Sequence, residues 1–219
     1  MRNFYNRHAG ETALLVGNGP NLKQTPPEWF GYPSFGMNTV HRYEGWIPTY
    51  YTAVDARVER EFGREIATKY ADIPKFIPWP NLDHWQGDNF YRFYHSPEPF
   101  PPIDAGRLRN PDMPDIGLTY GNIMHIALQL AAWMGFETIL MIGVEHKPSE
   151  AREHFWGFDA GMSEFAPVAD WLKGYKEIAA KLAGMGIRVL NISQDTYVPE
   201  DVLPRGDWKD WRNHEIKNA

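Results

Sequence analysis

Two glycines that bracket an asparagine follow an apolar run near the N-terminus. Residues 13–16 read Ala-Leu-Leu-Val and end in Gly17-Asn18-Gly19, with Pro20 behind them. Glycine permits backbone angles closed to other residues and lets a ligand approach the main chain closely. In α/β proteins, nucleotides commonly bind in the loop beyond the carboxyl end of the first strand. We therefore expect Gly17, Asn18 and Gly19 to form part of a nucleotide site.

Neither standard phosphate-binding pattern is complete in this segment. A G-x-G-x-x-G pattern would need a glycine at position 22, which is Leu22, and Pro26 and Pro27 prevent a long helix from following. No Gly-Lys-Ser/Thr follows, so the P-loop pattern fails as well. The alternative interpretation is a tight turn that ends a buried strand.

Polar side chains also follow the next two expected strands. Asn38 follows Gly36-Met37, and Asp55 follows Ala53-Val54. Asparagine offers donors and an acceptor, and a carboxylate accepts from sugar hydroxyls. Each residue alone more often ends a strand or shapes a turn than binds a ligand. Together with Asn18, they predict a polar pocket.

Residues 117–122, Gly-Leu-Thr-Tyr-Gly-Asn, lead into a strongly apolar helix. Thr119 is the expected N-cap, and the free backbone N–H groups of Thr119, Tyr120 and Gly121 would suit a phosphate. Gly121 in a first helical turn would cost about 1 kcal/mol against alanine, which the close approach of a ligand would explain. The alternative is a buried, capped helix that binds nothing.

The segment from Gly143 to Gly157 holds the candidates for proton transfer. Histidine is the usual general acid or base near neutral pH, so His146 and His154 are the candidate catalytic residues. Glu145 is a candidate metal ligand, although the chain has no H-E-x-x-H motif. His125 lies within the apolar helix, where we expect a hydrogen-bonded core histidine.

The elements that position these residues alternate between strand and helix. Strands are expected at 12–16, 34–37, 50–54, 75–78, 138–142 and 188–192, and helices at 57–70, 120–134 and 164–183. Continuous apolar strands interleaved with helices predict an α/β, Rossmann-like fold, with a mostly parallel sheet and helices on both faces.

The 219 residues fit a single nucleotide-binding domain, 1–219. Residues 79–115 are rich in proline and aromatic side chains and long for a connection. We interpret them as an insertion that leaves the sheet, as a lid or as a contact in a homo-oligomer. Residues 197–219 are expected to form a C-terminal extension in which Trp208 and Trp211 pack back on the body.

Composition excludes several classes of protein. A net charge of −6 argues against sequence-independent binding to nucleic acid. No apolar run is long enough to span a membrane, and no signal peptide is evident. The absence of cysteine removes disulfides, thiolate nucleophiles and cysteine metal sites, and it suits a reducing cytoplasm. We therefore expect a cytoplasmic protein.

Several of these segments together resemble one known family, the 6-hydroxymethylpterin diphosphokinase MptE-like family. This Rossmann-like group takes in domains of motility-associated glycosyltransferases and is similar to small bacterial sialyltransferases. The resemblance covers residues 12–203 and is weakest over 79–115. The matching segments are residues 15–22 (LVGNGPNL), 36–38 (GMN), 53–55 (AVD), 120–122 (YGN), and 135–146 from Gly-Phe to Ile-Gly-Val-Glu-His.

On the sialyltransferase side, the resemblance implies a CMP-activated sugar donor and a small-molecule or glycan acceptor, with no metal required. Asn18 and Asn38 would contact the nucleotide, Asp55 the ribose or base, and the helix start at 119–121 the phosphate. His154 would be the base.

On the pterin side, the resemblance implies pyrophosphate transfer from ATP with Mg²⁺, near Glu145, His146 and Asp55. Both chemistries make the chain a nucleotide-dependent transferase, and we favour the glycosyltransferase. The diphosphokinase is the first alternative, and a non-catalytic module that binds a nucleotide or sugar is the second.

Overall fold

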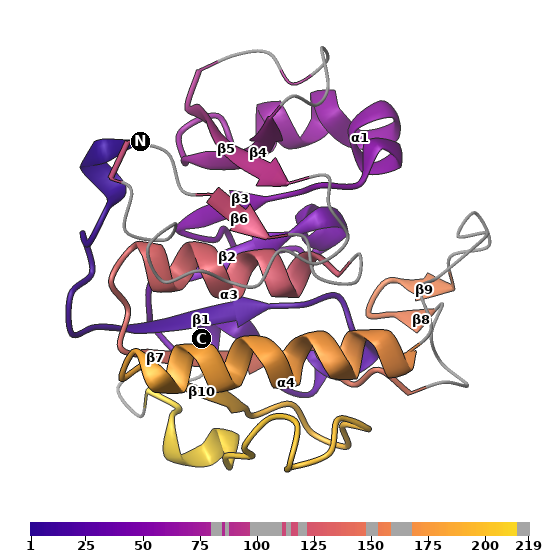
Figure 1. Ribbon diagram of the computed structural model, residues 1–219. Helices are drawn as coiled ribbons and strands as arrows, with labels where there is room; N and C mark the ends of the chain where they lie inside the picture. Colours follow the sequence, from indigo (N-terminus) through magenta and orange to yellow (C-terminus); the bar gives the residue numbers. More distant parts are fainter. Residues whose placement is uncertain are drawn as a thin grey trace.

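The computed structural model describes residues 1–79, 85, 88–96, 111–112, 115–117, 122–147, 153–158 and 168–213. Within these residues, eight strands form one parallel sheet in the order β10-β7-β1-β2-β3-β4-β5-β6 (Figure 1). The strands are β1 (Thr12–Val16), β2 (Ser34–Met37), β3 (Tyr50–Thr52), β4 (Lys75–Trp79), β5 (Phe90–Ser96), β6 (Asp115–Gly117), β7 (Thr138–Ile142) and β10 (Arg188–Asn191).

The order of the strands reverses beside β1. From β1 the chain builds the sheet outward through β2 to β6, and it then returns to the other side of β1 with β7 and β10. All of these strands are parallel, so their carboxyl ends meet at one edge. In open α/β sheets, ligands bind at that edge, at the point where the strand order reverses. The carboxyl edge at β1 and β7 is therefore the expected site.

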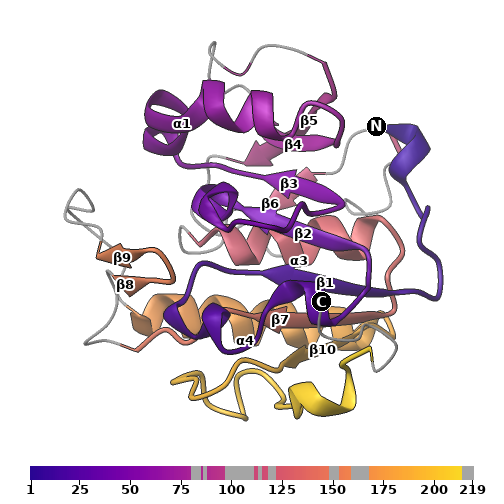
Figure 2. The ribbon, with the colours of Figure 1, turned by 180° about the vertical axis from the view of Figure 1, so that it is seen from behind.

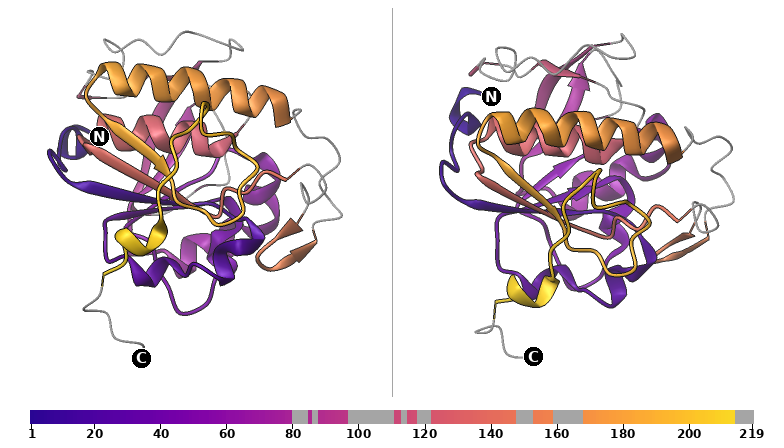
Figure 3. Two further views of the ribbon diagram at one scale, coloured as in Figure 1. Left: turned by 90° about the horizontal axis from the view of Figure 1, so that it is seen from below. Right: turned by 60° about the horizontal axis from the view of Figure 1, so that its bottom comes forward.

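Helices cover both faces of the sheet (Figure 3). On one face lie α3 (Ile123–Trp133) and α4 (Val168–Gly184), and their apolar residues share a core with the sheet. On the other face lie α1 (Ala56–Lys69) and the short 3₁₀ helices η2 (Pro20–Lys23), η3 (Pro27–Trp29) and η4 (Asn38–Arg42). The predicted α/β Rossmann-like class, with a parallel sheet and helices on both faces, is confirmed.

The two core clusters explain why the central strands are apolar along their whole length. Leu15 faces the core beneath α3 and α4, whereas Leu14 and Val16 face the core beneath α1. A strand that is covered on both faces has no side for polar residues. From Met124 to Trp133, α3 is likewise buried at every position.

The interpretation of residues 79–115 as an excursion from the sheet is wrong for its described part. β5 and β6 add to the sheet as parallel strands beyond β4. Trp85 is buried beside Tyr51 and Phe90, with ring centroids 6.3 and 5.6 Å away. The role of the segment as a lid or oligomer contact stays a prediction.

Two further elements lie outside the sheet. β8 (Glu153–His154) and β9 (Gly157–Phe158) pair as a small antiparallel hairpin, seen again from behind in Figure 2. Near the C-terminus, η6 (Trp208–Asp210) places Trp208 against Trp29, with ring centroids 5.3 Å apart. Trp211 also packs against the core beneath α1, so the predicted packing of both tryptophans is confirmed. The assignment of 1–219 to a single domain stays a prediction.

Candidate functional site

Asn18 and Asn38 lie side by side at the carboxyl ends of β1 and β2. Val16 is in register with Gly36, and the Asn18 side-chain amide donates to the Met37 carbonyl at 3.1 Å. Because a carbonyl only accepts, Nδ2 must face Met37 and Oδ1 must point elsewhere. The Oδ1 atoms of both asparagines are buried and have no hydrogen-bond partner within the described structure. Within the described residues, the site therefore contains two buried acceptors that lack donors.

The backbone of Asn38 is itself held in place. Its φ of 45° lies in the left-handed region, which asparagine tolerates better than most residues. The Asn38 carbonyl accepts from the Tyr51 hydroxyl of β3 at 2.7 Å. The loop after β2 is thus anchored to the next strand.

Gly17 and Gly19 lie against the loop after β7. Their N–H groups donate to the carbonyls of Ile142 and Gly143, at 2.8 and 3.0 Å. A Cβ at Gly17 would collide with the Gly143 carbonyl oxygen, and one at Gly19 with the Glu145 carboxylate. The packing between the two loops therefore already requires these glycines. Contact between the glycines and a nucleotide stays a prediction.

Asp55 is the N-cap of α1. Its Oδ1 accepts from the Arg57 N–H at 2.8 Å, which satisfies one of the free donors of the first turn. This role accounts for Asp55 at the end of β3. A contact between its other carboxylate oxygen and a ribose stays a prediction.

The start of α3 differs from the prediction. Asn122 is its N-cap, because Oδ1 of Asn122 accepts from the Met124 N–H at 2.9 Å. The prediction of Thr119 as N-cap is therefore wrong, because the described helix begins at Ile123. Thr119, Tyr120 and Gly121 lie outside the described residues, so their contact with a phosphate stays a prediction.

His146 lies on the loop after β7, and its ring is engaged by α4. Its Nε2 lies 2.8 Å from the Tyr175 hydroxyl and 3.5 Å from the Asn122 amide. Its φ of 49° is left-handed. The residue as a whole is half-buried, but its ring is enclosed by Trp171 and Tyr175, with centroids 5.0 and 5.5 Å away.

This environment keeps His146 neutral. Burial, with a smaller contribution from His125, lowers the pKa of His146 to about 3. Burial also raises the pKa of Tyr175 far above its usual value, so the tyrosine hydroxyl keeps its proton. His146 is therefore poorly suited to be a general base, although it can donate a hydrogen bond.

His154 reaches the strand-end edge by way of the hairpin β8–β9. The next residue, Phe155, donates its backbone N–H to the Asn18 carbonyl at 3.0 Å. The His154 ring lies 5.0 Å from that of Trp156 at an interplanar angle of 31°. The residue next to His154 therefore contacts the loop of Asn18, whereas His146 lies on the side of α4. His125 is fully buried, and its Nε2 lies 3.2 Å from the Trp171 carbonyl, so its predicted place in the core is confirmed.

Glu145 is buried, with 2% of its surface exposed, behind Gly19. Across the described part of the chain, no group of three histidine, aspartate or glutamate side chains is arranged to hold a metal ion. A role for Glu145 beside Mg²⁺ stays a prediction.

Sequence reasoning missed four residues that shape this edge: Thr39, Asn122, Trp156 and Tyr175. The helical spacing of Tyr175 within the apolar face of α4 indicates that it is buried. Its hydroxyl contact with His146, 29 residues away in the chain, leaves no local signal in the sequence. Asn122 was visible as an alternative N-cap three residues beyond Thr119. None of the described helices is long and apolar enough to cross a membrane.

Comparison with known proteins gives one informative match. The sialyltransferase CstII from Campylobacter jejuni, in complex with the substrate analogue cytidine-5'-monophosphate, has a TM-score of 0.51 and 11% identity with this chain, covering 94% of it and 88% of CstII. A family 2 AP endonuclease from Brucella melitensis has a TM-score of only 0.19, at 15% identity over 83% of this chain and 54% of its own, and carries no argument. No family model matches the chain, and no curated protein matches it significantly. The likeness to CstII shows a shared Rossmann-like fold.

Proposed function

We propose that this protein is a transferase that uses a CMP-activated sugar as its donor and a small molecule or glycan as its acceptor. The fold that it shares with a CMP-bound sialyltransferase supports a nucleotide at the carboxyl edge of the sheet. The resemblance of its sequence segments to the same group supports the choice of a cytidine nucleotide.

One observation carries the proposal, namely the two buried amide oxygens of Asn18 and Asn38. A buried acceptor without a donor costs about 1–3 kcal/mol. Ribose hydroxyls and the cytosine amino group are donors that would satisfy them. Binding of a nucleotide would therefore remove the free-energy cost of these unpaired oxygens, and this would contribute to the affinity.

In the proposed reaction, an acceptor hydroxyl oxygen attacks the anomeric carbon of the donor sugar. The bond from that carbon to the phosphate oxygen breaks, and CMP leaves with the bonding pair. The hydroxyl proton passes to the imidazole of His154, which lies on the hairpin whose Phe155 N–H donates to the Asn18 carbonyl.

A thermal-shift panel of nucleotides, each with and without Mg²⁺, tests the proposal. At a hundredfold excess over Kd, binding adds about 2.7 kcal/mol, which raises Tm by about 5–10 °C. We expect CMP to give this shift without Mg²⁺. Absence of a shift with any cytidine nucleotide contradicts the proposal.

The same panel, together with assays of nucleotide release, separates the alternatives. Stabilisation by ATP that requires Mg²⁺, with AMP released when a pterin is added, would show the diphosphokinase instead. Binding of CMP without any release of CMP from a CMP-sugar would show a non-catalytic binding module. A loss of CMP release in His154→Ala, with unchanged affinity for CMP, would show catalysis.

A further inference from the structure

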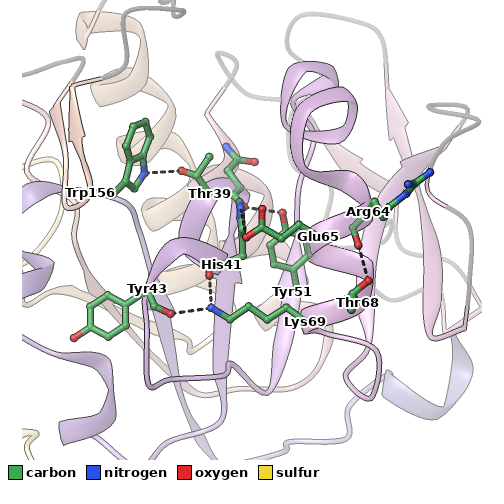
Figure 4. Close-up of polar contacts among 10 residues, drawn as sticks. Thr39, His41, Tyr43, Tyr51, Arg64, Glu65, Thr68, Lys69 and Trp156 are labelled. Carbon is green, nitrogen blue, oxygen red and sulfur yellow. Dashed lines mark hydrogen bonds and ion pairs between the residues drawn. The ribbon is translucent and has the colours of Figure 1, made fainter.

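The hairpin β8–β9 is joined to the two loops that carry Asn18 and Asn38. Phe155 donates its N–H to the Asn18 carbonyl at 3.0 Å. The indole N–H of Trp156 donates to the Thr39 hydroxyl at 3.2 Å, as Figure 4 shows. Thr39 directly follows Asn38, so the hairpin contacts both nucleotide loops.

Trp156 contacts both His154 and the segment after β2. Its indole ring lies 4.2 Å from the Arg42 guanidinium carbon, which also lies 4.6 Å from the ring of Phe62 in α1. The same indole lies beside the His154 imidazole. A guanidinium on an aromatic face contributes about 0.5–1 kcal/mol at an exposed site. Trp156 thus touches both the candidate base and residues of η4, which is itself packed on α1.

The hairpin needs such contacts because its own pairing is weak. Each of its strands has two described residues, and within the described part of the chain β8 pairs only with β9. An isolated two-stranded hairpin is at best marginally stable in water. The position of His154 therefore depends on how the hairpin is attached to the sheet.

The segment to which Trp156 attaches is also anchored to α1. The Lys69 ammonium of α1 donates to the carbonyl of His41 in η4 and, at 3.1 Å, to that of Tyr43, which directly follows η4 (Figure 4). The Tyr43 ring in turn lies 5.5 Å from the buried ring of Phe155. Thr39 is thus part of a fixed support.

We propose that Trp156 is a positioning residue, whose indole N–H bond to Thr39 holds the hairpin so that His154 faces a donor bound at Asn18 and Asn38. This inference rests on the proposed function for its catalytic consequence. The attachment of the hairpin by Trp156 does not depend on that function and can be measured without a ligand.

The test compares Trp156→Phe, which keeps a ring but removes the N–H, with Thr39→Val, which removes the acceptor at nearly constant volume. Thr39→Ser keeps the hydroxyl and serves as the rescue variant. The matched controls are Trp208→Phe and Thr68→Val. Trp208 packs against Trp29, and Thr68 donates to the Arg64 carbonyl within α1, so the contacts described for both residues lie away from the hairpin.

The first readout is amide hydrogen exchange at Phe155, whose N–H is bonded to Asn18. We expect exchange at least about tenfold faster in Trp156→Phe and Thr39→Val, which corresponds to loss of about 1.4 kcal/mol of local stability. Thr39→Ser and both controls should match the wild type. Unchanged exchange in the first two variants would overturn the attachment.

The second readout is CMP release from CMP-sialic acid. A misplacement of about 1 Å can cost on the order of a hundredfold in rate. In both Trp156→Phe and Thr39→Val, we expect kcat to fall at least about tenfold while KM changes less than about twofold. Because both substitutions remove the same hydrogen bond, the variant that combines them should lose no more activity than either single variant. Equal kcat in all variants, or additive losses, would overturn the positioning role. If the wild type releases no CMP, the proposed function fails, and hydrogen exchange alone decides the attachment.

Discussion

Replacing Gly17 with alanine tests the packing between the loops after β1 and β7. A Cβ at this position would collide with the backbone oxygen of Gly143, and would lie 3.3 Å from that of Ile142. Neither oxygen is the end of a flexible side chain, and Gly17 itself donates its N–H to Ile142. Overpacking of this kind costs about 1–3 kcal/mol, and the rigid neighbours place Gly17→Ala near about 3 kcal/mol. For a chain of this length, Tm should fall by about 6–12 °C.

The assay is urea unfolding, with Gly63→Ala as the matched control. Gly63 lies inside α1, where an added Cβ would lie 3.6 Å from the Glu59 side chain in ordinary contact. Alanine should therefore stabilise that helix by about 0.5–1 kcal/mol. If Gly17→Ala has the same urea midpoint and the same slope as the wild type, the claim that packing between these two loops requires glycine is refuted.

Three other substitutions give predictions. His146 has a pKa of about 3 in the folded state and an ordinary pKa in the unfolded state, so the unfolded state takes up a proton first as the pH is lowered. The free energy of unfolding, measured with urea, should therefore fall between about pH 6.5 and pH 3. His146→Gln should show a smaller fall over the same range, and an equal fall would contradict the assignment. Lys75→Met should cost about 1–3 kcal/mol in urea unfolding, because the buried ammonium donates to the carbonyls of Tyr70 at 2.6 Å and Ile73 at 2.9 Å; a neutral result would contradict this. Asn122→Ala should cost about 1 kcal/mol by removing the cap of α3, and an unchanged Tm would show that the cap is dispensable.

The central strands were predictable because burial on both faces leaves a continuous apolar run. The predicted bounds of β1, β2 and β7 agree with the structure. β5 was not predicted, since Phe90–Ser96 mixes aromatic and polar residues within a segment rich in proline. Such a pattern gives neither the period of an amphipathic strand nor a continuous apolar run.

The polar strand ends were predictable, but their partners were not. Asn18, Asn38 and Asp55 could be placed at one edge because parallel strands bring their carboxyl ends together. The roles of Gly17 and Gly19 depend on Gly143 and Glu145, more than a hundred residues away in the chain. Tertiary contacts of this length leave no trace in local spacing.

The central claim is that a cytidine nucleotide binds at the carboxyl edge of the sheet against Asn18 and Asn38. The most direct test is a crystal structure of the protein with CMP. The account predicts a hydroxyl or amino group of CMP within about 2.7–3.2 Å of the Oδ1 atom of each asparagine. CMP bound elsewhere, or at this edge with both oxygens still lacking a donor, would contradict it.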